Sequence, residues 1–244
     1  MDNDMFDHTG EFGRPLAEWD RTGADLRGYM SSVYLRMAGG IAISGFASWL
    51  VSYDPALARI LFTENGLTGI GWVVTIAPLG LVLLLSTAID RLSATAAGAI
   101  FMSYAALVGL SLGDLALVYT GANLATTFLG AAAGFIALAW VGSMTRRDLS
   151  GIVSFLTVGL VGLIVAMLVN LFVRSARFDF ILSITGIFLF AGFTVSDAQR
   201  LKHLYLEAAT DGRNRLAVIG ALTLYLDFLN IFLFLLRFSA QRRR

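Results

Sequence analysis

The sequence predicts an all-α membrane protein, a bundle of seven transmembrane helices. Of its 244 residues, 57% are hydrophobic and 14% are charged, whereas a soluble domain is nearer half apolar and a quarter charged. From about residue 33 onward, long charge-free runs alternate with short charged breaks. Each run has about the 20 residues that a helix needs to cross a hydrocarbon core. Helices are expected because lipid offers no partner to an unpaired peptide group.

Seven apolar segments follow one another along the chain. They cover roughly residues 31–52, 68–89, 94–113, 122–143, 150–173, 178–200 and 215–237. Charged or turn-forming stretches separate most of them, such as "SYDP", where Pro55 ends the first segment, and "TRRDLSG" at 145–151. The boundary after the third segment is the softest, because only Asp114 and the glycines interrupt "GDLALVYTGAN". The longest charged loop, at 199–215, precedes the last segment.

The chain divides into a polar N-terminal tail at 1–27, one seven-helix transmembrane domain at 28–240 and a basic C-terminal tail at 241–244. The first thirty residues are polar and acidic, whereas a cleavable signal peptide is basic and then apolar. We therefore expect a mobile or surface-lying tail without a signal peptide. One bundle fits the length, and no second domain is expected.

Lysine and arginine favour cytoplasmic loops, so their distribution predicts the orientation. With a cytoplasmic N-terminus, eleven of the 18 Lys and Arg residues lie inside, within 14–36, at 91, within 146–147 and within 200–215. The other seven lie outside, and four of them belong to the C-terminal end. A re-entrant last segment would change this split to fifteen and three. Segment length favours seven full crossings, so we expect a multi-pass protein of the cell inner membrane with a cytoplasmic N-terminus.

Small residues recur at four-residue spacing in two segments, at Ala94 and Gly98 and at Gly130 and Gly134. Such pairs let two helices approach closely. They indicate either packing within one bundle, which we favour, or a face for dimerisation.

Composition also limits the classes of function. A net charge of +1 argues against a nucleic-acid partner. The chain has no cysteine, which excludes disulfides and thiolate metal sites. The two histidines, His8 and His203, lie outside the apolar runs. Neither a histidine-rich zinc site nor a serine–histidine catalytic pair is therefore expected inside the membrane, and we expect no cofactor.

The last segment, "LTLYLDFLNIFLFLLRF", carries one carboxylate near its middle, Asp227. A charge at that depth in lipid costs about 3 kcal/mol or more. The residues that share its helical face are Gly220, Thr223 and Asn230. Leu, Ile and Phe occupy the opposite face, so this polar stripe is expected to face the bundle interior. The alternative for Asp227 is a neutral, hydrogen-bonded carboxylic acid that serves packing alone.

The sixth segment ends in "FAGFTVSDAQRLKH", which places Asp197 on one face with Thr194. Asp197 alone could simply pair with Arg200 near the membrane surface. Consecutive helices are often neighbours, however, so Asp197 and Asp227 are expected to meet. Two carboxylates in a low-dielectric site repel, and one tends to hold its proton. Such a pair responds to pH, and when ionised it offers hard oxygen ligands suited to Ca²⁺.

Two membrane aspartates also raise the alternative of an intramembrane aspartyl protease. That class uses Tyr-Asp and Gly-x-Gly-Asp motifs on adjacent helices. Here Ser196 precedes Asp197, and Leu226 precedes Asp227. The nearest approach to the second motif is "SLGD" at Asp114, where Ser111 replaces the first glycine. We therefore expect no enzymatic activity.

Four stretches carry a resemblance to a known family: "LRGYMSSVYLRMAGGIAISG", "RRDLSGIVSFL", "FTVSDAQRLKH" and "LTLYLDFLNIFLFLLRF". With the number of segments, they make roughly residues 26–238 similar to the Bax inhibitor family of membrane proteins, in its bacterial branch. The two aspartate motifs are the specific part, since the apolar remainder matches many membrane proteins. The resemblance implies that the last helix is central and surrounded by the other six.

The resemblance also implies a function. It implies a di-aspartyl site, here Asp197 and Asp227, that senses pH and controls a Ca²⁺ leak. The family has an arginine near the end of the second helix that latches onto the acids. Arg91 in "IDRLSATAAG" is the candidate, although the match is offset by about one position and Asp90 could neutralise it. The alternative for Arg91 is an ordinary anchor in a cytoplasmic loop.

Some bacterial members of the family are instead linked to regulation of a membrane-bound ATP-dependent protease. A non-transporting regulator or binding partner of such a protease is therefore the alternative function, and the polar N-terminal tail would then matter most. A secondary transporter is a third class, but no convincing internal repeat of the kind such folds carry is present. The expected partners are the lipid bilayer, Ca²⁺ and protons, and under the alternative a membrane protease.

Overall fold

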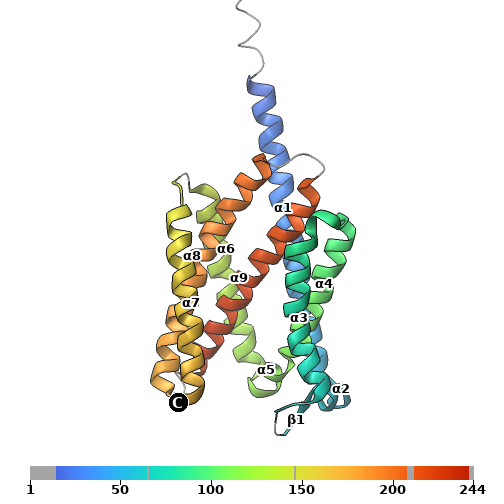
Figure 1. Cartoon of the computed structure of the whole chain (residues 1–244), viewed down its shortest axis with the longest axis vertical. Coiled ribbons are helices and arrows are strands. Elements are labelled where there is room, and N and C mark those ends of the chain that lie inside the picture. The colour runs from blue at the N-terminus through green and yellow to red at the C-terminus, as the bar shows by residue number, and fades with distance from the viewer. Residues whose placement is uncertain (1–14, 65, 146, 208–211, 242–244) are drawn as a thin grey trace, which may run out of the picture.

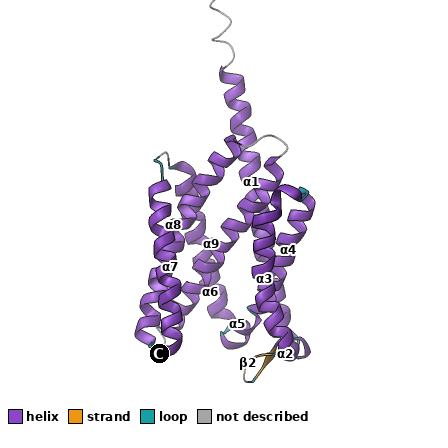
Figure 2. Ribbon diagram, viewed as in Figure 1, coloured by secondary structure: helices purple, strands orange, loops and turns teal. Residues whose placement is uncertain are grey.

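Helices make up almost all of the chain that the structure, a computed structural model, describes (Figure 1, Figure 2). The described residues are 15–64, 66–145, 147–207 and 212–241. The long helices are α1 (Pro15–Tyr53), α3 (Gly69–Ala88), α4 (Ala94–Ser111), α6 (Gly121–Met144), α7 (Ser150–Val173), α8 (Ala176–Glu207) and α9 (Arg213–Gln241). The short elements are α2 (Pro55–Leu61), α5 (Gly113–Val118), the 3-10 turn η1 (Ile89–Arg91), β1 (Phe62–Thr63) and β2 (Gly66–Leu67).

Seven helices of the described chain are long and apolar enough to cross a membrane, which confirms the predicted all-α membrane fold. Their spans are Asp25–Tyr53, Gly69–Ala88, Ala94–Leu115, Gly121–Met144, Ser150–Val173, Ala176–Leu206 and Arg213–Gln241. The N-terminal end of α1 and the C-terminal end of α9 lie at opposite ends of the bundle (Figure 1). The last helix has 29 residues and is about 43 Å long at the usual helical rise. It crosses the bundle completely and is not re-entrant.

Short polar side chains start several helices near the predicted breaks. The Oδ1 atom of Asp54, which precedes Pro55, accepts a hydrogen bond from the Ala56 N–H at 2.8 Å. The hydroxyl groups of Thr68 and Ser93 each accept from the third amide of the helix that follows, α3 and α4 respectively. Such caps satisfy amides that the first helical turn leaves unpaired. The polar residues of the predicted breaks therefore cap the helices that follow them.

Two features differ from the sequence prediction. Helix α1 already begins at Pro15, inside the stretch expected to be a polar tail, because no proline interrupts 16–53. Its first turns project beyond the other helices (Figure 1), while residues 1–14 and 242–244 of the predicted tails lie outside the described residues. In addition, β1 and β2 form a small antiparallel hairpin between α2 and α3, with Gly66 at a φ of 131° that favours glycine.

The last helix is central, as predicted. In the spanning window of α9, 56% of the residues are buried, against 11–39% in the other six spans. It packs chiefly on α8, α1, α6 and α4, whereas α3 packs on α4 and α7 packs on α8. The expected ring of six helices is thus an inner group of four, with α3 and α7 in outer positions. Buried side chains of α9 such as Leu224, Tyr225 and Leu236 form the middle of the core.

The glycines of the two small-residue pairs are not sites of close helix packing inside the bundle. A methyl group added at Gly98, Gly130 or Gly134 would have no heavy atom within 4 Å, and the last two residues are exposed. Large apolar side chains of α6 such as Leu129 and Ile136 are also exposed, as expected of surface that contacts lipid. The favoured prediction of intramolecular packing is therefore wrong for these glycines.

Candidate functional site

The packing of α8 against α9 brings the two predicted acids to one level of the bundle. A methyl group added at Gly220 would lie 2.7 Å from Leu201, and one added at Gly186 would lie 2.6 Å from the Phe234 ring. These contacts fix the register of two antiparallel helices. Between them, Asp227 comes level with about residue 194, and Asp197 is about one helical turn away.

Asp227 is buried, with 5% of its surface exposed. Its Oδ2 atom is enclosed and has no hydrogen-bond partner among the described residues. A buried oxygen without a partner costs about 1–3 kcal/mol. A proton on the carboxyl or a cation beside it would remove that cost, so the geometry marks Asp227 as a place where either can act.

Asp197 is half-buried on α8. Its carboxylate interacts electrostatically with Asp227, and the Arg200 guanidinium interacts electrostatically with Asp197. The structure therefore brings the two carboxyl groups within range of each other, as the order of the helices predicts. Arg200 is exposed, and among the described residues no ion-pair contact within 4 Å joins it to Asp197, so simple pairing does not account for the acid.

The polar residues predicted to support the acids bond to their own helices. The hydroxyl of the fully buried Thr194 donates to the Phe190 carbonyl at 2.8 Å. Thr223 donates to the Ile219 carbonyl at 3.1 Å, and the Asn230 amide donates to the Leu226 carbonyl at 2.8 Å. Within the described chain none of the three is hydrogen-bonded to Asp227. Their role in supporting the acids stays a prediction. Their side-chain oxygens could still accept a hydrogen bond from a protonated carboxyl group.

The structure does not bring Arg91 to the acids. It lies in η1, after α3, and its side chain is exposed. No hydrogen bond or ion pair joins it to Asp197 or Asp227 in the described part of the chain, and the side chain of Asp90 is not described. The turn lies at the same end of the bundle as the end of α8 (Figure 1). A latch would therefore require the end of α3 to move toward α8 and α9.

The donor set for a cation is small. Within the described residues, no group of three or more His, Cys, Asp or Glu side chains could hold a metal ion. Asp197 and Asp227 supply at most four carboxylate oxygens, whereas Ca²⁺ takes about 6–8 oxygen ligands. Water, hydroxyl or carbonyl oxygens would have to complete the shell, so the two carboxylates alone do not form a closed cation site.

A buried tyrosine that sequence reasoning missed joins three helices. The Tyr225 hydroxyl, on α9, lies 2.8 Å from the Ser44 Oγ atom on α1. Ser44 in turn donates to the Ala105 carbonyl of α4 at 2.7 Å. A buried tyrosine hydroxyl normally needs such a partner. The presence of Tyr225 in an apolar segment could therefore have indicated a polar contact between helices. These bonds hold the side of α9 that faces away from Asp227.

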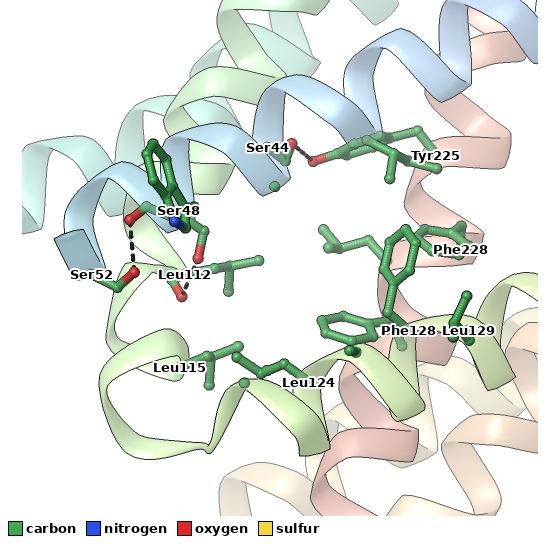
Figure 3. A pocket seen from close by; sticks show the side chains of 17 residues that line it. Ser44, Ser48, Ser52, Leu112, Leu115, Leu124, Phe128, Leu129, Tyr225 and Phe228 are labelled. Carbon is green, nitrogen blue, oxygen red and sulfur yellow. Dashed lines mark hydrogen bonds between the residues drawn. The ribbon is translucent and has the colours of Figure 1, made fainter.

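A cavity of about 530 Å³ lies on that side, between α1, α5, α6 and α9 (Figure 3). Its walls are mostly apolar, with Phe128 and Phe228 on one side, and Ser44 and Ser48 of α1 on the other. A groove of about 750 Å³ between α1 and α6 shares part of this lining. Neither lining includes Asp197 or Asp227, so α9 separates the cavity from the acids.

The connection between α6 and α7 is clasped to α8 beside Asp197. The amide of Gln199 donates to the Thr145 carbonyl at 3.0 Å and to the Arg147 carbonyl at 2.7 Å. Lys202 donates to the Ser143 carbonyl. Gln199 is buried and lies two residues after Asp197, so this clasp holds α8 at the level of the acid.

The same connection carries an exposed carboxylate at the start of α7. Asp148 accepts from the Ser150 N–H at 2.9 Å and from its hydroxyl at 3.0 Å. These hydrogen bonds lower the pKa of Asp148, and the bond from the backbone N–H has the larger effect. The electrostatic interaction with His203 lowers the pKa further. Asp148 is therefore ionised near neutral pH and stabilises the first turn of α7.

The sequence matches the family model of "Inhibitor of apoptosis-promoting Bax1" over residues 26–244. The chain is 40% identical over 223 residues to the inner membrane protein YbhL of Escherichia coli K12, covering 90% of this chain and 94% of YbhL. A Rickettsia prowazekii protein is 40% identical over 220 residues, covering 89% of this chain and 91% of its own. A Streptococcus pyogenes membrane protein is 35% identical over 214 residues, with 87% and 92% covered.

The family match includes both aspartates and all seven spanning helices, and the similar proteins are covered almost end to end. It agrees with the resemblance carried by the two aspartate motifs. By its sequence, this chain belongs to the Bax inhibitor family.

Proposed function

We propose that this protein is a pH-sensitive Ca²⁺ leak of the inner membrane, with Asp197 and Asp227 as its sensing site. The observation that carries the proposal is the buried Oδ2 atom of Asp227, which has no partner among the described residues. The second carboxylate lies within electrostatic range. An unpartnered acid beside another acid is a site whose occupancy by protons or cations changes easily. The location follows YbhL, whose name places it in the inner membrane.

The proposed switch is a competition for the pair of carboxyl groups. At low pH both groups tend toward neutrality and can hydrogen-bond each other. At higher pH the shared proton leaves, and two adjacent anions attract a cation between them. Ca²⁺ supplies that charge during passage, and Arg91 supplies it if the end of α3 moves inward. Proton, arginine and Ca²⁺ then bias a two-state bundle.

This mechanism predicts how Ca²⁺ flux responds to pH. Purified protein in liposomes that enclose a Ca²⁺ dye is assayed across about pH 5 to 8, the range in which a coupled acid pair in a buried site can titrate. We expect Asp197→Asn and Asp227→Asn each to lose most of the pH dependence. The double variant should add little, because the two groups act as one unit.

A matched control is Asp54→Asn at the opposite end of the bundle. Asp54 is exposed and caps α2, and asparagine caps a helix about as well. Its flux should keep the wild-type pH response. Fully additive effects of the two site variants, or an unchanged response in Asp227→Asn, would contradict the proposed pair.

A second candidate is a non-transporting partner of a membrane-bound ATP-dependent protease. The observation that favours it is the N-terminal part of α1, which extends beyond the other helices (Figure 1). Deletion of residues 1–24 stops short of the span that begins at Asp25. A leak should survive this deletion, whereas a contact made by the N-terminal helix should not, as measured by co-purification with the protease.

A further inference from the structure

Positive charge gathers at the turn between α7 and α8. Arg174 and Arg177 are exposed there, and Arg237 of α9 is exposed near Arg174, at the end of the bundle where α9 ends (Figure 1). Helix α7 has 24 residues and is the most apolar of the seven spans. It is about 36 Å long, enough to cross a hydrocarbon core of about 30 Å. The arginines after its last turn therefore lie at the depth of the lipid phosphates.

Two adjoining hollows surround these arginines. One, of about 710 Å³, is lined by Arg174, Arg177, Asp179 and Gln241. The other, of about 500 Å³, has Arg174 and Arg237 in its lining. The two share Arg174 and Asp179, so they form one continuous surface around the turn.

The second hollow extends from the arginines along apolar surface. Ile164, Leu168 and Leu171 of α7 line it, together with Leu182 of α8. The three α7 residues share one helical face. The surface is therefore cationic at one end and apolar over about two helical turns below it, which is the pattern of a phospholipid headgroup and acyl chain.

The protein itself leaves this charge largely uncompensated. The guanidinium groups of Arg174 and Arg177 have no hydrogen bond or ion pair to any residue that the structure describes, and Arg237 lies over the Phe234 ring at 5.9 Å. The one carboxylate in the lining, Asp179, accepts a hydrogen bond from the Gln241 amide. The buried Oε1 atom of Gln241 has no partner in the described part of the chain. Three exposed guanidinium groups, including that of Arg237, and one acceptor are thus available to a ligand.

The backbone of the turn gives an independent reason to look for a role of Arg174. It has φ 53° and ψ 34°, and among the described residues it is the one non-glycine residue with positive φ. Glycine or asparagine adopts this conformation most easily. The turn is closed without the arginine side chain, because Asn170 Oδ1 accepts from the Ser175 N–H at 3.1 Å. The turn geometry alone does not call for arginine at this position.

We propose that this surface, the α7–α8 lipid site, binds one anionic glycerophospholipid from the outer leaflet of the membrane. Its phosphodiester lies between Arg174 and Arg237, where guanidinium groups can form paired hydrogen bonds with phosphate oxygens. One acyl chain follows the apolar face of α7. A headgroup hydroxyl donates to Gln241 Oε1. Phosphatidylglycerol has all three parts, whereas phosphatidylcholine has a phosphate but neither the net negative charge nor the hydroxyl.

The test is lipid retention by the full-length protein in detergent, measured by native mass spectrometry. Dioleoyl phosphatidylglycerol or dioleoyl phosphatidylcholine is added at equal concentration. We expect the wild type to retain one phosphatidylglycerol in preference to phosphatidylcholine. Arg174→Gly should weaken that retention by about tenfold or more, the usual effect of losing a hydrogen bond to a charged group. Glycine suits the backbone at this position, so the variant should fold at least as well.

Arg237→Gln tests the same site without touching the turn, and it should weaken retention similarly. The control is Arg59→Gln, which removes an exposed arginine of α2 at the same end of the bundle and should change nothing. Dihexanoyl phosphatidylglycerol has the headgroup without long acyl chains, and inorganic phosphate has only the anion. Their binding shows whether the acyl chain contributes to recognition. If either binds as well as the long-chain lipid, or if Arg59→Gln weakens retention as much as the site variants, the proposal is overturned. Because flux is not the readout, the outcome does not depend on the proposed leak.

Discussion

Asp227 is a carboxyl group in a buried position that costs free energy when it is ionised. A charged carboxylate in a buried position is stable only when it is paired or hydrogen-bonded. The structure places Asp227 in the most buried helix and leaves its Oδ2 atom without a partner among the described residues. A hydrophobic side chain would pack there at lower cost. The acid therefore makes better physical sense as a group that exchanges a proton or a cation than as a group that stabilises the bundle.

This argument predicts the stability of Asp227→Asn. The substitution removes a buried charge and keeps the volume, so the free energy of unfolding should stay within about 1 kcal/mol of wild type or rise slightly. Thermal unfolding of the purified protein in detergent at pH 7 measures it. A variant that no longer accumulates as folded protein would identify the acid as structural and remove the main support for a sensing role.

The residues of the site were predictable to the extent that helix order and periodicity determine them. Asp197 and Asp227 lie on consecutive helices. The polar stripe on α9 did not mark a single inward face, because Thr223 and Asn230 are half-buried whereas Leu224 and Tyr225, outside the stripe, are buried. The bond between Ser44 and Tyr225 joins residues 181 positions apart, and the partners of Gln199 are carbonyls of a connection. Neither leaves a local pattern in the sequence, so only the fold reveals them. The exposed position of Arg91 likewise depends on where α3 ends.

At the scale of elements, one glycine sets how closely α6 approaches the site helix. A methyl group added at Gly142 would lie 2.2 Å from the Val195 carbonyl oxygen, a backbone atom that cannot rotate away. Val195 is two residues before Asp197, so this contact and the clasp of Gln199 fix the same part of α8. Gly134, a further two turns back on α6, has no heavy atom within 4 Å of an added methyl group.

The two glycines predict opposite outcomes for the same substitution. Gly142→Ala should lower the free energy of unfolding by about 1–3 kcal/mol, because α6 and α8 must move apart. Gly134→Ala should be neutral or stabilising by up to about 1 kcal/mol, because alanine favours helix and meets no neighbour. The free energies of unfolding of both variants, measured in the same detergent, test the contact between α6 and α8. Equal stabilities would show that α6 and α8 are not in contact at residue 142.

The start of α7 should depend on pH through Asp148. Its pKa is lowered in the folded protein by its hydrogen bonds to Ser150, so its stabilising effect is complete above the ordinary Asp value of 3.8 and is lost as pH falls through the lower folded value. Protection of the Ser150 amide against hydrogen exchange should therefore be high at neutral pH and fall in strong acid. In Asp148→Ala the protection should already be low at neutral pH; an unchanged amide would contradict the cap.

The sequence predicted which segments form the seven spanning helices, but it did not predict where those helices begin and end. Crossing a bilayer demands about 20 apolar residues, so composition alone marked the seven spans. The helical turns of α1 and α8 that extend outside the hydrocarbon core need not be apolar, so composition does not reveal them. Both helices therefore begin earlier and end later than predicted. The two-residue strands β1 and β2 are shorter than any pattern that alternation of side chains could signal.

At the scale of the whole molecule, α9 connects the features described above. It carries Asp227 on the side facing α8, Tyr225 on the side of the cavity, and Arg237 at the C-terminal end of the bundle. Of the Lys and Arg residues that the structure describes, most lie toward the end of the bundle that holds η1, the end of α8 and the start of α9. Because α9 crosses the bundle fully, Asp227 of the proposed pH-sensing pair and Arg237 of the proposed lipid site lie at different depths of one helix.

This arrangement predicts the topology of the chain. Seven crossings put the termini on opposite sides of the membrane, and the distribution of Lys and Arg puts the N-terminus in the cytoplasm. Green fluorescent protein, which fluoresces only when it folds in the cytoplasm, should be bright when fused before Met1 and dark when fused after Arg244. Alkaline phosphatase, which is active only outside, should show the reverse pattern at each end. Two bright green fusions would contradict the full crossing by α9, whereas an exchange of the two patterns would keep seven crossings and invert the protein in the membrane.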